Sequence, residues 1–416
     1  MNASIAAPQS DAASSGSRPR HLGRYKVLPT YCLVLMFGAL CIPIGVLWDI
    51  SWHSTIGRDT FWTPAHILTY LGGLIPGLTC GWLALKTHFF GSPEERAPSV
   101  SFWGFRAPLG AWVVIWGTFT MLLSAPFDNW WHNAYGLDVK ILSPPHTVLA
   151  VGMLAVALGV LFLMVSWQNR TGQESPVAAY LFVFMAGILL LMASIFLTER
   201  STPNQQHTAG FYFLSARPYP VYLVAAARAS RLRWPATIVA SVYMLLLMAM
   251  IWILPLFEGH PKLAPIYNPV DHMVPPAFPL LLIAPAIAID LIVQWSRRKR
   301  IIAAESDAAR PWWRSQFVRD FGLAALIGVA FMAVFIPVQW NFSKFLISRS
   351  ADNWFFAGGQ FFPYTSGSHG MAWRNQYWDL DENPFTLRAA LIATSLAILF
   401  SRIGLGFGNW MAKVRR

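Results

Sequence analysis

Charged residues are scarce in this sequence. Asp, Glu, Lys and Arg make up 12% of the 416 residues, whereas hydrophobic residues make up 55%. A soluble domain usually carries about twice that share of charge. The composition therefore argues against an ordinary soluble protein and indicates a chain that lies largely in a membrane.

Two further absences narrow the class. The short alternating segments of a membrane β-barrel are missing. The three cysteines, Cys32, Cys41 and Cys80, lie in apolar runs and form no CxxC pair. Neither a disulfide framework nor a thiolate metal site is supported, so any metal would be bound by nitrogen and oxygen.

Apolar runs near 20 residues recur, and each is long enough to cross a bilayer as a helix. Backbone groups in lipid must satisfy one another, so we expect an all-α, polytopic helical bundle in contact with the lipid bilayer. The sixth of about ten spans is expected to be broken or re-entrant, because Arg217, Pro218 and Pro220 interrupt it. The predicted spans are 29–48, 64–86, 108–126, 146–167, 178–197, 211–227, 236–256, 276–296, 319–339 and 386–407.

Basic residues predict the orientation. If the spans alternate, the basic clusters all fall on one side, and the positive-inside rule places both termini in the cytoplasm of a bacterial-type inner membrane. The net charge of +12 is thereby assigned to topology and not to nucleic acid. These clusters contain Arg18, Arg20, Arg24, Lys26, Arg228, Arg231, Arg233, Arg297, Arg298, Lys299, Arg300, Lys413, Arg415 and Arg416.

One polar pattern occurs twice, each time between apolar spans on the predicted outer side. Two residues four apart share a helix face, and a short loop would return the last His to that face. Two imidazoles and one carboxylate suit Cu, Zn, Fe or Ni. The two sets are Asp49, His53 and His66, spaced Asp-x3-His-x12-His, and Asp128, His132 and His146, spaced Asp-x3-His-x13-His.

A second acidic residue follows the first His of each set by six positions. These residues, Asp59 and Asp138, could orient a ligating His or bridge two metals if the hairpins converge. The alternative is that both sets are interfacial polar residues, with neighbouring Trp side chains as membrane anchors. Duplication favours metal binding, because ionisable groups at membrane depth are costly.

The first motif strongly resembles the C subunit of the copper membrane monooxygenases, the particulate methane and ammonia monooxygenase family. The resemblance implies a copper site at Asp49, His53 and His66 and a neighbouring one at the second set. It covers roughly residues 30–167, and where the family has an amide in its second motif this chain has Asp128. The matching residues read Trp52-His53-x-Thr55-x-x-Arg58-Asp59-Thr60-x-x-Thr63-Pro64-x-His66.

We therefore expect a copper-binding membrane protein that activates O2 and oxidises a small apolar substrate, with iron as the alternative metal. Electrons would come from an external donor or quinol, and further subunits or a homo-oligomer are implied. One alternative is copper transport or handling. The other is a non-catalytic subunit in which the metal is a structural staple.

Three regions are predicted along the chain: a disordered N-terminus at 1–26, a four-helix metal region at 27–170 and a six-helix region at 171–416. The aromatic outer loop 341–384, which contains His369, is expected to be a lid or an interfacial loop. Asp290, a lone acid within the eighth span, would serve a proton or ion path or pair near the cytoplasmic end with Arg297 or Arg298.

Overall fold

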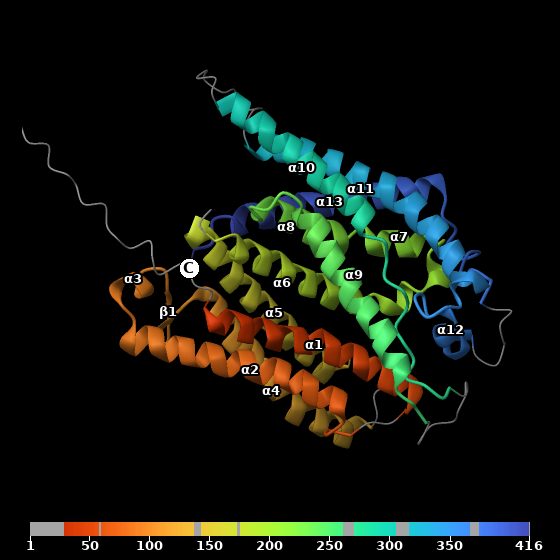
Figure 1. The fold of residues 1–416 in the computed structure, drawn as a ribbon, viewed down its shortest axis with the longest axis horizontal. Helices are drawn as coiled ribbons and strands as arrows, with labels where there is room; N and C mark the ends of the chain where they lie inside the picture. The colour runs from red at the N-terminus through yellow and green to blue at the C-terminus, as the bar shows by residue number, and fades with distance from the viewer. Residues whose placement is uncertain are drawn as a thin grey trace, which may run out of the picture.

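The computed structural model describes residues 29–57, 60–136, 143–172, 175–260, 270–304, 316–366 and 374–415, and the predicted N-terminal segment 1–26 lies outside them. Long helices packed side by side form a bundle (Figure 1), so the predicted all-α architecture is confirmed. The elements are α1 Thr30–Thr55, α2 Pro64–Leu85, α3 Pro93–Arg96, β1 Val100–Phe102, β2 Phe105–Ala107, α4 Leu109–Tyr135, α5 Pro144–Thr171, α6 Pro176–Ile195, α7 Ala209–Ser215, α8 Pro218–Ala229, α9 Pro235–Ile253, α10 Ile283–Ala304, α11 Gln316–Ile347, α12 Gly358–Ser366 and α13 Leu387–Met411.

Eight helices of the described residues are long and apolar enough to cross a membrane, which fits a multi-pass protein. They are Thr30–Thr55, Pro64–Phe90, Leu109–Tyr135, Pro144–Thr171, Pro176–Ile195, Pro235–Leu256, Phe317–Ile347 and Leu387–Met411.

Two of the predicted spans take another form. The span predicted at 211–227 is split into α7 and α8, as its prolines indicate. The span predicted at 276–296 is helical only from Ile283, and residues 274–280 are buried or half-buried non-helical backbone. Its prolines lack the N–H that a helix needs, and neighbouring side chains satisfy part of the remaining backbone. Thus Leu280 N donates to the Tyr243 hydroxyl at 3.1 Å, and Leu281 N donates to Gln339 Oε1 at 3.0 Å.

Small residues bring the first four long helices together. A Cβ added at Gly117 of α4 would lie 2.7 Å from the backbone nitrogen of Val156 in α5, so a side chain there would force the helices apart. Between the hairpins, the Thr118 hydroxyl of α4 donates to the Gly73 carbonyl of α2 at 3.0 Å. The α1–α2 and α4–α5 hairpins therefore pack against each other as one unit.

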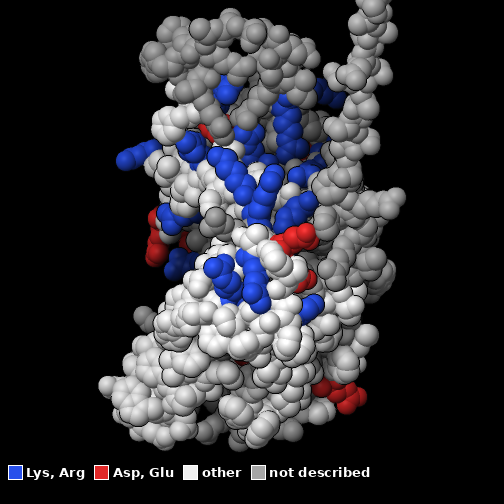
Figure 2. All heavy atoms as spheres, turned by 90° about the vertical axis from the view of Figure 1, so that its left-hand side faces the viewer, with Lys and Arg blue, Asp and Glu red and all other residues white. Residues whose placement is uncertain are grey.

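Lys and Arg gather at one end of the bundle. Figure 2 looks at the left-hand end of Figure 1, where the C-terminus lies, and shows a cluster of basic side chains there. The α1-to-α2 and α4-to-α5 connections lie at the opposite end in Figure 1. Basic residues occur close to the ends of α2, α5, α8, α10 and α13 and the start of α9: Lys86, Arg170, Arg231, Arg233, Arg298, Lys413 and Arg415.

Asp290 and Arg297 of α10 each complete the end of another helix. The Asp290 carboxylate accepts hydrogen bonds from Ala236 N at 3.1 Å and Thr237 N at 2.8 Å, at the N-terminus of α9. The Arg297 guanidinium donates to the Ala227 carbonyl at 2.6 Å, at the C-terminus of α8. An anion thus faces the positive end of one helix dipole and a cation the negative end of another. The Arg297 charge also acts on the Asp290 carboxylate, which agrees with the pairing that the sequence offered as one alternative.

We expect Asp290→Ala to lower the free energy of unfolding by about 2 kcal/mol, because two backbone donors of α9 lose their charged acceptor. The thermal unfolding midpoint of the detergent-purified protein should then fall by a few degrees. Asp381→Ala, which removes an exposed carboxylate, is the matched control. An unchanged midpoint in Asp290→Ala would show that the carboxylate does not support α9.

Candidate metal centre

The first hairpin brings its three predicted residues together. Asp49 and His53 lie one turn apart near the C-terminal end of α1, and His66 lies in the first turn of α2 behind Pro64. Proline fits the first helical turn because its missing N–H would have no helical partner there. Asp49 Oδ1 lies 3.1 Å from His66 Nε2, and Asp49 Oδ2 lies 3.8 Å from His53 Nε2. The carboxylate therefore stands between the two imidazoles.

The second hairpin repeats this arrangement at the junction of α4 and α5. Asp128 Oδ1 lies 3.4 Å from His132 Nε2 and 3.6 Å from His146 Nε2. The Ser143 hydroxyl caps α5 by accepting the backbone N–H of His146 at 3.4 Å. Each set therefore uses a helix end for its Asp-x3-His pair and the start of the next helix for its second His.

Backbone contacts define which ring nitrogen faces the carboxylate. A carbonyl oxygen can only accept, so His66 Nδ1–H donates to the Thr60 carbonyl and His132 Nδ1–H donates to the Gly136 carbonyl, both at 3.0 Å. In a neutral imidazole the remaining Nε2 then carries a lone pair. That lone pair faces a carboxylate oxygen, which is also an acceptor. The arrangement is favourable only when a cation or an added proton lies between them.

Each aspartate also has one oxygen that accepts no hydrogen bond from the part of the chain that the structure describes. Asp49 Oδ1 and Asp128 Oδ1 are buried and accept no hydrogen bond from the described residues. Such an atom is costly to bury without a partner. Two donors that bind one ion at roughly 2.0–2.2 Å lie about 3.0–3.6 Å apart. Three of the four Asp–His distances, 3.1, 3.4 and 3.6 Å, fall within this range, and the fourth, 3.8 Å, lies outside it.

In neither set do the three side chains surround a common metal position, as far as the described residues show. Among the described residues, no group of three or more His, Cys, Asp or Glu side chains is arranged so that it could hold a metal as it stands. In the first set, His53 is the outlying donor, and its side chain is 51% exposed. Asp59 and Asp138, predicted to orient or bridge, lie outside the described residues.

The other outer histidines have structural partners. The His207 ring stacks between Trp340 and Tyr377, with centroid separations of 3.5 and 3.6 Å, and its Nε2–H donates to the Trp340 carbonyl at 3.0 Å. His272 contacts Asp271 Oδ1 at 2.9 Å and donates to the Gln360 carbonyl at 3.1 Å. Both imidazoles thus hold loop segments against neighbouring parts of the chain. His369 of the outer loop lies outside the described residues.

Three buried polar residues, Gln206, Gln339 and Arg374, belong to no recognisable motif in the sequence. Gln206 and Gln339 are fully buried, and Gln339 Nε2 donates to Gln206 Oε1 at 2.7 Å. The guanidinium of Arg374, also fully buried, donates to both carboxylate oxygens of Asp352. Their sequence separations are long, so only the tertiary structure pairs them.

No protein-family model, curated protein or solved structure matches the chain. The functional argument therefore rests on the two hairpins, their donor geometry and the resemblance of their motifs.

The stability of the protein should depend on pH through His207. Burial lowers the pKa of His207 from its ordinary value of 6.5, and the nearby Lys344 charge lowers it further, although the hydrogen bond to Trp340 opposes this. The unfolded state then binds the proton more tightly. Neutral His207 therefore contributes fully to the free energy of unfolding above pH 6.5. This contribution is lost as the pH falls through the lower pKa that His207 has in the folded state.

We expect the thermal unfolding midpoint to decline below about pH 6.5 and His207→Gln to flatten that decline. Gln keeps an N–H donor for the Trp340 carbonyl but cannot take up a proton. His260→Gln changes an exposed side chain and serves as the control. If both variants follow the wild-type pH profile, another group controls the acid sensitivity.

Proposed function

We propose that this chain is a multi-pass membrane metalloprotein whose two hairpin sets each bind a metal ion. More particularly, we propose that the metal is copper and that the protein is an O2-activating monooxygenase, or a subunit of one, acting on a small apolar substrate. The observation that supports the metal sites is that Asp49 Oδ1 and Asp128 Oδ1 are buried, accept no hydrogen bond from the described residues and lie 3.1 and 3.4 Å from an imidazole nitrogen. The second step depends on the resemblance to the copper membrane monooxygenases.

The candidate ligands are Asp49, His53 and His66 in one set and Asp128, His132 and His146 in the other. A bound copper ion would supply the binding and activation of O2. The chain supplies the rest of the site. The carbonyls of Thr60 and Gly136 hold two imidazoles with Nε2 toward the carboxylates, as outer-shell partners do at metal sites.

The surroundings of the hairpins suit a substrate that arrives through lipid. On α4, the side chains of Phe119, Leu122 and Leu123 are 54%, 61% and 53% exposed. In a bilayer these positions face acyl chains, in which small apolar molecules dissolve. The substrate would therefore approach from the side of the bundle.

The proposed topology has ten passes, with α7–α8 and the 274–282 segment with α10 as the two interrupted ones. The basic end in Figure 2 would face the cytoplasm, together with both termini. The two hairpin sets then lie on the periplasmic or outer side, where an external electron donor or a quinol, and further subunits or a second copy, would meet them.

Copper transport, the main alternative, needs polar ligands along the bundle. The predicted spans contain few of them apart from some Met, and Asp290 is one. Its carboxylate is used by the α9 N-terminus. The other alternative is a non-catalytic subunit in which the metal only stabilises the fold. It would use the same ligands as an oxygenase, so only a measurement of activity distinguishes the two.

Metal content tests the ligand sets. We expect protein purified in nanodiscs under copper-replete conditions to hold copper near one ion per intact set, measured by elemental analysis. His53→Ala/His66→Ala should lose the ion of the first set, and His132→Ala/His146→Ala that of the second. The loss in affinity should exceed the roughly 10–100-fold cost of an outer-shell change.

His260→Ala, outside both sets, is the matched control and should keep full copper content. Stoichiometric iron in place of copper would retain metal binding but contradict the link to the copper family. Protein without stoichiometric metal would overturn the proposal and leave the two sets as interfacial structure.

Oxygen-dependent product formation tests the activity. With an artificial electron donor, the copper-loaded protein should consume O2 and hydroxylate small alkanes or ammonia, and each double variant should reduce the rate at least tenfold. Copper content without turnover, also after addition of candidate partner subunits, would favour the staple. Uptake of labelled copper into vesicles would favour transport.

A further inference from the structure

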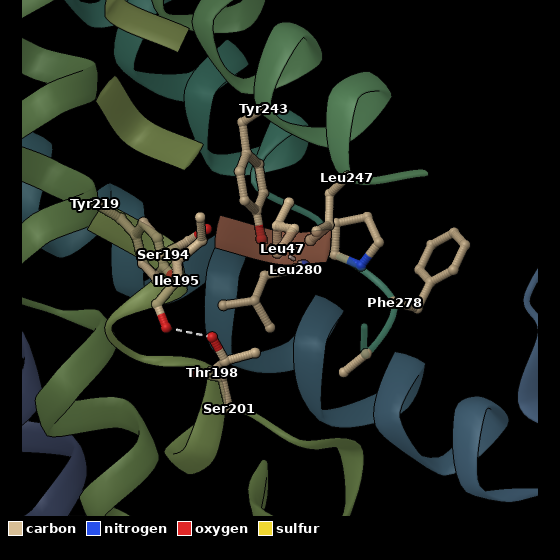
Figure 3. Close-up of a pocket in the computed structure, with 12 residues that line it drawn as sticks. Leu47, Ser194, Ile195, Thr198, Ser201, Tyr219, Tyr243, Leu247, Phe278 and Leu280 are labelled. Carbon is tan, nitrogen blue, oxygen red and sulfur yellow. Dashed lines mark hydrogen bonds between the residues drawn. The ribbon is translucent and has the colours of Figure 1, made fainter. Parts of the chain in front are cut away.

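The cavity shown in Figure 3 is bordered by α6, α9 and the non-helical segment before α10. Its volume of about 30 Å³ has room for two or three water molecules, so a larger partner does not fit there. The surface at the basic end of the bundle has room for one. At that end the connection from α2 to α4 contains the two-stranded β-hairpin formed by β1 and β2 (Figure 1).

The β-hairpin has two different faces. Phe102 pairs with Phe105 across the turn, and Ser101 pairs with Arg106. Because neighbouring residues of a strand point to opposite faces, the two Phe side chains share one face, and Ser101 and Arg106 share the other. Trp103 lies in the turn between the strands. The β-hairpin therefore has an aromatic face, a polar face and a Trp at its tip.

The backbone at the tip does not favour tryptophan. Trp103 and Gly104 both have positive φ, 47° and 81°, as the two central residues of a type I′ turn do. Asn or Gly adopts this conformation readily, whereas a bulky residue there is strained. The ring of Trp103 therefore occupies this place at a cost to the turn, which indicates that the ring itself has a use.

The β-hairpin folds back along α4 and does not project from its end. Trp112 Nε1 of α4 donates to the Val100 carbonyl at 3.1 Å. The ring of Phe102 lies 5.8 Å from that of Trp116, and the ring of Trp103 lies 5.5 Å from it. Trp116 is about 10 Å beyond the start of α4 at 1.5 Å per residue. The tip is thus directed toward the membrane-spanning part of the helix.

The aromatic surface of the β-hairpin continues onto the side of α4 that would face lipid. The Trp116 ring lies 5.9 Å from that of Phe119, which is one of the exposed apolar residues of α4. Trp103 is 79% exposed, and Phe90, in the continuation of α2 at Lys86–Phe90, is 78% exposed. Phe105 connects the two elements, because its ring lies 6.2 Å from that of Phe89. Bilayer that covers α4 would therefore also reach these rings.

The charge nearby suits lipid headgroups. Lys86 and Arg106 have exposed side chains. Phosphate groups of an anionic leaflet attract Lys and Arg, and their aliphatic stems can lie along apolar surface while the charged ends reach the phosphates. Glu94 and Glu95 are exposed on the short α3. We expect α3 to face water, because phosphates repel carboxylates.

We propose that the β1–β2 hairpin is a membrane-interface anchor that binds the phospholipid headgroup layer at the basic end of the bundle. The rings of Trp103 and Phe90 lie among the headgroups and the first acyl carbons, as interfacial aromatic residues do. Arg106 and Lys86 contact the phosphates. The anchor is independent of the two metal sets, which lie at the opposite end of the bundle.

The test measures the depth of the β-hairpin in nanodiscs that contain phosphatidylglycerol. The three native cysteines are buried, so a spin label reacts with an introduced, exposed cysteine. Ser101→Cys carries the label and keeps the aromatic residues. EPR power saturation then compares the access of O2, which is enriched in lipid, with that of a water-soluble nickel chelate. Glu94→Cys on α3 is the control in water, and Leu122→Cys on α4 is the reference in lipid.

We expect the O2-to-nickel ratio at position 101 to be severalfold higher than at 94 and lower than at 122. Trp103→Asn, added to Ser101→Cys, should lower the ratio at 101 toward that at 94, because Asn suits the turn but lacks the interfacial ring. Trp62→Asn is the matched control. Trp62 is 72% exposed and precedes α2 at the other end of the bundle, so the ratio at 101 should not change.

A ratio at 101 equal to that at 94 would place the β-hairpin in water and overturn the proposal. A label shielded from both reagents would place it against protein, such as a second copy, and would also overturn it. The same holds if Trp103→Asn leaves the ratio unchanged. Trp103→Gly replaces Trp103→Asn if the latter does not fold by circular dichroism and size-exclusion chromatography, since Gly also adopts positive φ.

Discussion

Every backbone N–H and C=O that lies in lipid must find a partner within the protein, and the rest of this structure depends on that constraint. Long helices satisfy it by themselves. Where the chain is not helical, side chains provide the hydrogen bonds. Tyr243 and Gln339 accept the N–H groups of residues 280 and 281. Asp290 and Arg297 bond to backbone groups at the ends of α9 and α8. At each of these places a polar side chain thus satisfies backbone that no helical partner reaches.

The same constraint explains where the two Asp/His/His sets lie. A helix end and the start of the next helix leave backbone carbonyls and N–H groups without helical partners. Gly136 and Thr60 use such carbonyls to hold imidazole rings, and Ser143 caps the helix that carries His146. A hairpin end in a membrane protein therefore supplies both the donors and the groups that orient them. Two hairpins of this design, packed through α2 and α4, place their sets at one end of the bundle.

Much of this was predictable from local pattern. Apolar runs predicted the long helices, and the prolines at 218 and 220 predicted the break between α7 and α8. The Asp-x3-His spacing, with a proline before the last His, predicted which side chains would meet across each hairpin. The 276–296 span was predicted incorrectly as one helix, because hydropathy measures how well a segment suits lipid and does not register the prolines that prevent helix formation. The stack of His207 on Trp340 was not predictable, since the two residues are 133 positions apart, and no motif marked the Arg374–Asp352 pair.

The sequence by itself determined the class of fold, the hairpins that carry the two polar sets and the residue types available to a metal, because these depend on short-range periodicity and spacing. Only the tertiary structure decided that Asp49 and Asp128 each keep a buried oxygen that accepts no hydrogen bond from the described residues, and that Asp290 caps α9. These features depend on contacts between segments far apart in the chain. Burial, and with it the cost of an unsatisfied polar group, exists only once those segments have packed together.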